Sequence, residues 1–235
     1  KTAYEIHRWL EFRRGALPIL IFASSSSVYG GNTKYPYEEK HSSSHPLSLY
    51  AATKKSNELM AHVYSHLFNL PCSGLRFFTV YGPWGRPDMA PMIFTKNIIE
   101  NKPINIFNNG EMERDFTYID DVVEIIYRLL DKPPTSNKLF NKDNPDPSNS
   151  WAPYKIYNVG NSNPVKLIDF VNLIEKELGK KAIKNFLPMQ KGDVRSTAAD
   201  TRIIEELIGY KSKTDIKIGI KKFIEWFKNY YNFQP

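Results

Sequence analysis

The sequence predicts an α/β fold in which a parallel β-sheet carries helices on its faces. Residues 18–23 (PILIFA) and 75–81 (LRFFTVY) form short, continuous apolar runs of the kind found in buried parallel strands. A segment with helical spacing of apolar residues lies between them, so the order is strand, helix, strand. The chain has 235 residues, enough for one large or two small domains.

The helix between the two strands is expected to begin at Ser48, because serine is a favourable N-cap residue. It is expected to end before Pro71, whose ring cannot continue a helix. Its apolar stripe consists of Leu59, Val63, Leu67 and Leu70.

The later elements follow from similar local signals. We expect a helix around residues 94–100, a strand at 104–107 and a turn at Asn108-Asn109-Gly110. Asp120 is expected to cap a helix that runs to Leu130. Residues 131–153 hold five of the sixteen prolines and predict a long surface loop. A strand at 154–158 and amphipathic helices at 167–178 and 216–230 complete the list.

Composition narrows the class of protein. Cys72 is the single cysteine, so no internal disulfide is possible and a reducing, cytoplasmic location is expected. No stretch approaches the roughly 18 apolar residues of a membrane span. The net charge is +7, but the lysines are scattered and concentrate near the C-terminus. This distribution indicates a solvated surface and no nucleic-acid partner.

Tyr50 and Lys54 are the first candidates for chemistry. Residues four apart share one face of a helix, and a lysine cation there favours the phenolate form of a tyrosine. This pairing can make a tyrosine a general base at neutral pH. Such pairs also occur by chance, so the context matters. Ser25 precedes Tyr50 by 25 residues and follows an apolar strand, where parallel sheets place ligands.

Four motifs occur in order: FASSSSVYG (22–30), SLYAATK (48–54), LRFFTVYGPWGRPDM (75–89) and NGEMERDFTYIDD (109–121). In these the chain resembles, from about Pro18 to its C-terminus, the epimerase and dehydratase branch of the extended short-chain dehydrogenase/reductase family. The serine run and the segments TVYGPWGRPDMAP, FNNGEMERDFTYIDD, APYKIYNVGNS and FLPMQKGDV are most similar to UDP-glucuronate 4-epimerases.

This resemblance implies the C-terminal part of a doubly wound parallel, Rossmann-type sheet with a smaller α/β substrate-binding domain. Residues 1–82 would be the remaining part of the NAD-binding domain. Residues 83–235 would mainly bind the nucleotide sugar, with segments near 104–130 and 154–160 returning to the sheet. NAD is the implied cofactor, a UDP-sugar the substrate, and a homodimer the assembly of the complete enzyme.

The resemblance also implies roles for individual residues. Tyr50 would be the base, Lys54 would support it and hold the nicotinamide ribose, and Ser25 would bind the sugar 4-hydroxyl. Thr79 and Arg86 would face the sugar carboxylate. The full set for the substrate is Ser26, Ser27, Thr79, Arg86, Phe107, Arg114 and Asp193, and the set for the cofactor is Tyr50, Lys54, Ser24 and Phe77. Arg86 and Arg114 could instead be surface or helix-capping cations.

The chemistry accounts for these residue types. Inverting C4 of the sugar requires transient oxidation, with proton transfer by the protein and hydride transfer by the cofactor. The 4-keto form of a uronic acid is a β-keto acid and can lose CO₂. Hydroxyls of Ser26, Ser27 and Thr79, with the Arg86 cation, could hold the carboxylate in a conformer that prevents this loss.

Alternatives within the family remain open. Dehydratases carry an Asp-Glu pair after the residue that matches Ser25, and here those positions are Ser26 and Ser27. Hydroxyls cannot supply a proton donor and acceptor of matched pKa, so we expect no 4-keto-6-deoxy product. The alternatives are a UDP-glucuronate decarboxylase, a sugar-nucleotide 4,6-dehydratase, and a truncated chain that binds nucleotide sugar without turnover.

The dinucleotide fingerprint G-x-G-x-x-G is absent from the sequence. We therefore expect the chain to be a fragment, a truncated gene product or part of a longer protein. His62 and His66 have a spacing that can bind metal, but no third ligand accompanies them, so no metal site is expected. The aromatic residues of segment 216–230 are expected to pack in a core.

Overall fold

A parallel sheet of three strands forms one half of the molecule. The computed structural model describes residues 18–233, so the first 17 residues of the expected unit 1–82 lie outside the described part. The strand order is β1-β2-β6, with β1 at Leu20–Ser25, β2 at Cys72–Phe77 and β6 at Tyr154–Val159. This arrangement confirms the predicted α/β fold with a parallel sheet.

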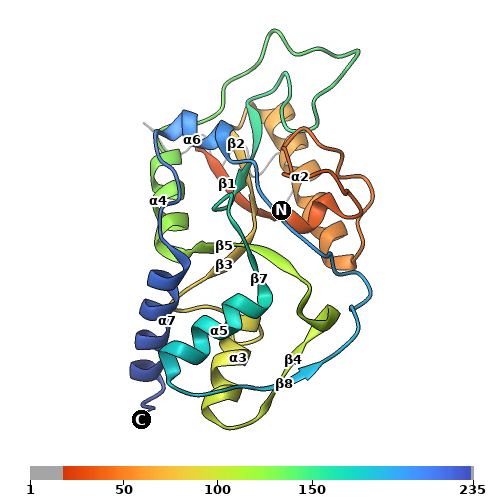
Figure 1. Cartoon of the computed structure of the whole chain (residues 1–235). Coiled ribbons are helices and arrows are strands. Elements are labelled where there is room, and N and C mark those ends of the chain that lie inside the picture. The colour runs from red at the N-terminus through yellow and green to blue at the C-terminus, as the bar shows by residue number, and fades with distance from the viewer. Residues whose placement is uncertain (1–17, 234–235) are drawn as a thin grey trace, which may run out of the picture.

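Helices cover both faces of this sheet (Figure 1). Helix α2 (Leu49–Phe68) packs on one face, and α4 (Ile119–Leu129) and α6 (Arg202–Ile208) pack on the other. The central strand fits tightly between its neighbours at Gly74. A Cβ atom there would lie 2.4 Å from Ile156 Cδ1 and 2.5 Å from Phe22 Cζ, so any larger residue would have to displace both side chains.

Helix α2 begins as the sequence predicts. The Ser48 side chain accepts a hydrogen bond from the Ala51 N–H at 3.2 Å, and the helix ends at Phe68, before Pro71. The apolar stripe, however, faces outward: Leu59, Val63 and Leu67 are between 49% and 61% exposed. The buried residues of α2 are instead the small or polar ones, namely Ala51, Glu58, Ala61 and Ser65.

The chain changes sheets after β2. The expectation of one strand over residues 75–81 is wrong, because β2 ends at Phe77 and a separate strand β3 spans Thr79–Tyr81. The Phe78 N–H still donates to the Val159 carbonyl at 3.0 Å, but β3 pairs with β5 (Glu113–Tyr118) in the order β3-β5-β7. Strand β7 (Pro164–Lys166) runs antiparallel to β5. Residues 75–81 form one largely apolar run because β2 and β3 both contribute to hydrophobic cores, although they belong to different sheets.

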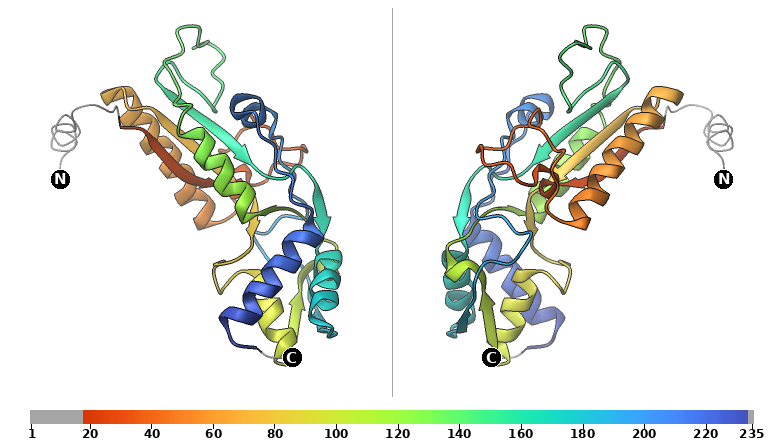
Figure 2. Two further views of the ribbon diagram at one scale, coloured as in Figure 1. Left: turned by 90° about the vertical axis from the view of Figure 1, so that its left-hand side faces the viewer. Right: turned by 90° about the vertical axis from the view of Figure 1, so that its right-hand side faces the viewer.

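A separate group of helices and strands forms the other half of the molecule (Figure 2), and this half has its own core. The core is built from α3 (Ala90–Ile99), α5 (Leu167–Leu178), α7 (Ile216–Tyr230) and β4 (Pro103–Ile106), together with residues of β3 and β5. Strand β8 (Ile183–Phe186) pairs in parallel with β4. The bounds of α5 and α7 confirm the two predicted amphipathic helices. The expected turn is the 3₁₀ segment η2 (Phe107–Gly110), in which Asn108 and Asn109 have φ near +50°.

Helix α4 and the loop that follows it were both predicted, the first with a wrong N-cap and the second correctly. The N-cap is Tyr118, without a side-chain hydrogen bond, so the prediction that Asp120 caps this helix is wrong. Asp120 lies in the first turn, where its charge suits the helix dipole. The predicted loop at 131–153 is confirmed, since it contains neither helix nor strand and extends from the end of the molecule opposite α5 and α7 (Figure 2).

His62 and His66 hold this loop on α2. The Trp151 indole N–H donates to His66 Nδ1 at 3.1 Å, and His62 Nε2 lies 2.8 Å from Ser150 Oγ. Within residues 18–233, no helix is long and apolar enough to cross a membrane.

Candidate active site

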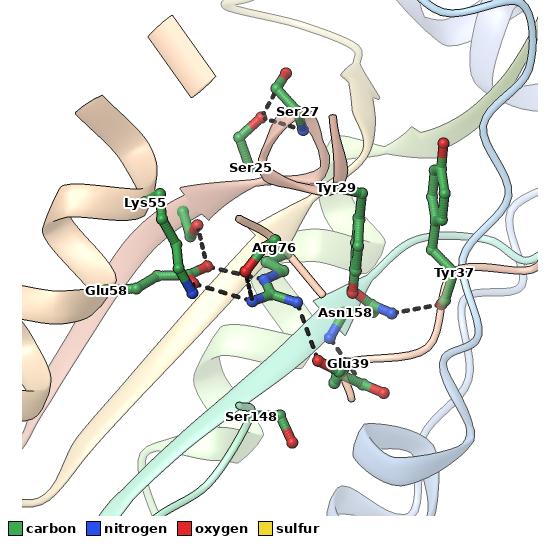
Figure 3. A network of polar contacts seen from close by, with 12 residues as sticks. Ser25, Ser27, Tyr29, Tyr37, Glu39, Lys55, Glu58, Arg76, Ser148 and Asn158 are labelled. Atoms are coloured by element: carbon green, nitrogen blue, oxygen red, sulfur yellow. Dashed lines mark hydrogen bonds and ion pairs between the residues drawn. The ribbon is translucent and has the colours of Figure 1, made fainter. Parts of the chain in front are cut away.

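The serine run folds into a short turn at the carboxyl end of β1. Ser25 ends the strand and caps the 3₁₀ turn η1 (Ser26–Tyr29), because its Oγ accepts from the Ser27 N–H at 3.2 Å. The Ser25 hydroxyl also donates to Ser27 Oγ at 3.1 Å (Figure 3). Several hydroxyls are thereby held together at the edge of the sheet where parallel α/β proteins bind ligands.

Tyr50 and Lys54 lie in the first two turns of α2, beside the same end of β1. Lys54 Nζ donates to the carbonyl of Ala23 at 3.0 Å, which ties the helix to the strand. The same Nζ lies 5.9 Å from the centre of the Tyr50 ring, and this ring is half exposed. An ammonium group has three donors, so Lys54 keeps two for a ligand.

Two other phenols near this edge are unsuited to act as bases. Tyr29 and Tyr37 are buried and stack on each other with ring centres 4.5 Å apart. Burial raises the pKa of Tyr29 to about 12 and raises the pKa of Tyr37 further. Both phenols therefore remain protonated at neutral pH, whereas Tyr50 is open to a ligand.

Two cavities meet next to the serine turn. The smaller, of about 150 Å³, is lined by η1 and the start of α2, and the larger, of about 500 Å³, extends between α3 and β5. Both are lined by Thr79, Arg114 and Asp193. Ser26 and Ser27 line the smaller cavity and Phe107 lines the larger. Together they form one cleft with hydroxyls at one end, a charged pair in the middle and an aromatic ring at the other end.

An ion pair stands at the junction of the two cavities. The Arg114 guanidinium on β5 donates to Asp193 Oδ1 at 2.8 Å and to the Glu113 carbonyl at 2.8 Å. Gly192 lets the segment with Asp193 pass close to the start of α2. It has a φ of +84°, and a Cβ there would lie 3.0 Å from the Leu47 carbonyl oxygen. The guanidinium contacts Asp193 through one nitrogen only, and its positive charge at the wall of both cavities suits an anionic group such as a phosphate.

Six of the twelve expected site residues line neither cavity. Ser25, Tyr50 and Lys54 lie beside the cavities, at the carboxyl end of β1 and in the first two turns of α2, and the other three are Ser24, Phe77 and Arg86. Ser24 is buried and its hydroxyl donates to Glu58 Oε1 at 2.6 Å. Phe77 packs toward the core beneath α4 and α6. The Arg86 side chain is 67% exposed and donates to Asp88 Oδ2 at 3.0 Å, although Asp88 itself lines the larger cavity.

Sequence reasoning overlooked a buried pair beneath this site. Glu58 on α2 and Arg76 on β2 are both fully buried and form two hydrogen bonds, at 2.8 and 2.9 Å (Figure 3). Two signals could have found them. Glu58 continues the four-residue spacing of Tyr50 and Lys54, and Arg76 is a charge within an apolar strand.

Comparison with protein families adds the decisive observation: residues 9–160, more than half of the chain, match the NAD dependent epimerase/dehydratase family. The chain belongs to this family. It is 57% identical over 212 residues to Protein CapI of Staphylococcus aureus, covering 90% of this chain and 64% of that protein. It is 47% identical to the probable UDP-glucuronate 4-epimerase of Rhizobium meliloti, covering 90% of this chain and 62% of that protein.

A solved structure of the family has a similar fold. The crystal structure of UDP-glucuronic acid 4-epimerase from Bacillus cereus, in complex with UDP-glucuronic acid and NAD, matches with a TM-score of 0.78 and 34% identity. The match covers 96% of this chain and 66% of that chain. The protein described here thus spans somewhat less than two thirds of the relatives that it matches.

Proposed function

We propose that this chain is part of an NAD-dependent epimerase that interconverts UDP-glucuronate and UDP-galacturonate at C4 of the sugar. The observation that carries the proposal is the cleft that runs from the serine turn, past Arg114 and Asp193, to Phe107. Hydroxyls at one end suit a sugar, the arginine suits a diphosphate, and an aromatic ring suits a pyrimidine. The names of the similar proteins support the same substrate.

The residues present fit the nicotinamide end of NAD. Lys54 has two donors left beyond its bond to Ala23, and Tyr50 beside it is half exposed at the carboxyl end of β1. The sequence lacks G-x-G-x-x-G, so the fit concerns the nicotinamide and ribose only. When bound, NAD supplies a hydride acceptor and donor for C4 of the sugar.

The chain's own residues supply the proton chemistry and the orientation. Tyr50 takes the proton of the 4-hydroxyl as C4 is oxidised, and returns it after the keto sugar has turned over. Lys54 places a positive charge beside this phenol. Ser25 donates a hydrogen bond to the oxygen at C4, and the Ser27 hydroxyl that it now contacts is the group that the sugar replaces.

A uronate substrate must also be protected from decarboxylation, because its 4-keto form can lose CO₂. Ser26, Ser27 and Thr79 line the cleft and can hold the carboxylate by hydrogen bonds. The exposed pair of Arg86 with Asp88 specifically favours a second candidate, UDP-glucuronate decarboxylation, because Arg86 must leave Asp88 before it can hold the carboxylate.

We also propose a division of the chain into domains, a homodimer and a cytoplasmic location. Residues 1–82 belong to the NAD side and residues 83–235 mainly to the sugar side, with β6 returning to the first sheet. The exposed apolar stripe of Leu59, Val63 and Leu67 suits a homodimer contact. A cytoplasmic location agrees with NAD and UDP-sugars as ligands and with a single free cysteine.

The test uses a full-length protein that carries this chain. UDP-glucuronate is supplied, and UDP-galacturonate and UDP-pentose are separated and quantified. We expect UDP-galacturonate, and we expect Tyr50→Phe to lower kcat by about 10²–10⁴-fold with UDP-sugar affinity within a few-fold, since one hydrogen bond is lost. A pentose as the main product would establish the decarboxylase, and an active Tyr50→Phe variant would remove Tyr50 from the role of base.

A further inference from the structure

A row of buried polar side chains crosses the first sheet just below the site. Ser24, Arg76 and Asn158 are register partners on β1, β2 and β6, and each is the residue before the last of its strand. All three are at most 3% exposed. Buried polar groups cost free energy unless they are paired. The hydrogen-bond partners of these three residues therefore indicate their role.

The first set of contacts reaches the helix that carries Tyr50 and Lys54. Arg76 binds Glu58 of α2 through Nε and a terminal nitrogen, and Glu58 also accepts from Ser24 at 2.6 Å. Burial opposes the charge of Glu58, but Arg76, Lys55 and Ser24 together outweigh burial and lower the pKa of this carboxyl. Glu58 lies one helical turn after Lys54, so it continues the face that begins at Tyr50.

The second set of contacts reaches the serine turn. The Arg76 guanidinium lies 4.7 Å from the centre of the Tyr29 ring, and Tyr29 is the last residue of η1. A terminal nitrogen of Arg76 donates to the Glu39 carbonyl at 3.1 Å. The Tyr29 hydroxyl donates to Asn158 Oδ1 at 2.6 Å, which fastens the turn to β6 (Figure 3).

We propose that Arg76 is a positioning residue that fixes the face of α2 with Tyr50 and Lys54 relative to the serine turn. One guanidinium contacts both elements, through Glu58 on one side and Tyr29 on the other. A buried ion pair is a weak source of stability compared with apolar packing, but its hydrogen bonds are directional. The catalytic meaning of this role rests on the proposed function, whereas the structural coupling does not.

The test replaces the pair by apolar side chains of similar volume, in the double variant Glu58→Leu with Arg76→Met. Such replacements of buried ion pairs commonly preserve or raise stability. We expect this chain to melt within about 5 °C of the unsubstituted one. Amide hydrogen exchange in η1 and in the first two turns of α2 should nevertheless quicken by about tenfold or more, with α7 unchanged as the internal control.

In the full-length protein the same double variant should lower kcat by about 10- to 100-fold, with KM for the UDP-sugar within about threefold. Retained exchange protection in both segments would overturn the proposal, and so would faster exchange with an unchanged kcat. The exchange experiment needs no substrate. If the unsubstituted full-length protein shows no turnover, the proposed function is refuted. The coupling of α2 to the serine turn through Arg76 is then still tested by hydrogen exchange.

A second variant covers the case in which the double variant does not fold. Ser24→Ala keeps the ion pair and removes the hydrogen bond that joins Glu58 to β1. Exchange in the first turns of α2 should quicken, while exchange in η1 should stay as it is. Unchanged exchange in α2 would overturn the proposal.

Discussion

Two arginine–carboxylate pairs lie near the serine turn and differ in their surroundings. Arg76 and Glu58 are both fully buried, while the side chains of Arg114 and Asp193 are 16% and 34% exposed. The shortest nitrogen–oxygen distance is 2.8 Å in each. The buried pair contacts a helix, a strand and a turn, whereas the other lines both cavities.

The difference shows that similar pair geometry can serve different purposes. Glu58, the Glu39 carbonyl and Ser43 use four of the five N–H donors of Arg76, and the side chain is fully buried, so it is closed to a ligand. Arg114 stands at the wall of an open cleft, where a phosphate can share it with Asp193. A buried arginine with most of its donors used suits the positioning of other elements, whereas a partly exposed arginine at a cavity suits ligand binding.

The largest expected effect is on stability: removing the arginine of the buried pair should destabilise the protein far more than removing the arginine of the partly exposed pair. Arg76→Met leaves the buried Glu58 charge with Lys55, at 3.1 Å, as its remaining cation, and should lower the free energy of unfolding by up to about 3–5 kcal/mol. Arg114→Met leaves a carboxylate that water can reach and should cost about 1 kcal/mol or less. Urea unfolding of the two variants measures both values. Equal losses would mean that the contrast in burial has no energetic consequence.

For UDP binding we expect the reverse order, with the larger loss in the Arg114 variant. Arg114→Met should weaken UDP binding by about 10- to 100-fold, because a charge-assisted contact of roughly 1.5–3 kcal/mol is lost. Isothermal titration with UDP checks this, with Arg128→Met as a matched control, since Arg128 pairs with Glu124 on α4 at the surface. A similar loss in the control variant would show that overall charge, and not the cleft, determines the affinity.

A third pair, Arg86 with Asp88, is exposed on both sides and should have a smaller effect. The unsubstituted full-length protein should prefer UDP-glucuronate to UDP-glucose, and Arg86→Ala should reduce this preference by about tenfold and release some pentose product. Asp88→Asn frees the arginine and should keep the preference. Equal use of the two substrates by the unsubstituted protein would refute the uronate assignment and leave the epimerase assignment intact.

The smallest expected effect concerns the loop at 131–153. Burial, with the nearby His66, lowers the pKa of His62, so the folded state binds a proton there less readily than the unfolded chain. The stability from this contact is therefore complete above about pH 6.5 and is lost as the pH falls through the lower folded-state pKa. Limited proteolysis of the loop should accelerate below pH 6.5, and His62→Gln should flatten this dependence. Equal acceleration in both proteins would place the titrating group elsewhere.

Much of the fold could be predicted because its signals are local. The Ser48 cap, the Asn-Asn-Gly turn and the bounds of α5 and α7 each depend on residues within a few positions of one another. The order of strands and helices followed from apolar runs and their spacing. The resemblance predicts roles for motif residues at the end of β1 and the start of α2, and the structure places these two segments side by side.

Other features were decided only when distant segments came together. The break at Phe78 arises because β6 and β5 each take one half of a continuous apolar run. Helix α2 buries its small and polar residues because the surface beneath it contains Arg76, and the charge of Arg76 requires Glu58 there in place of the leucine stripe. A single sequence shows which residues are apolar or charged, but not which partner satisfies a buried charge. That partner depends on contacts between residues far apart along the chain.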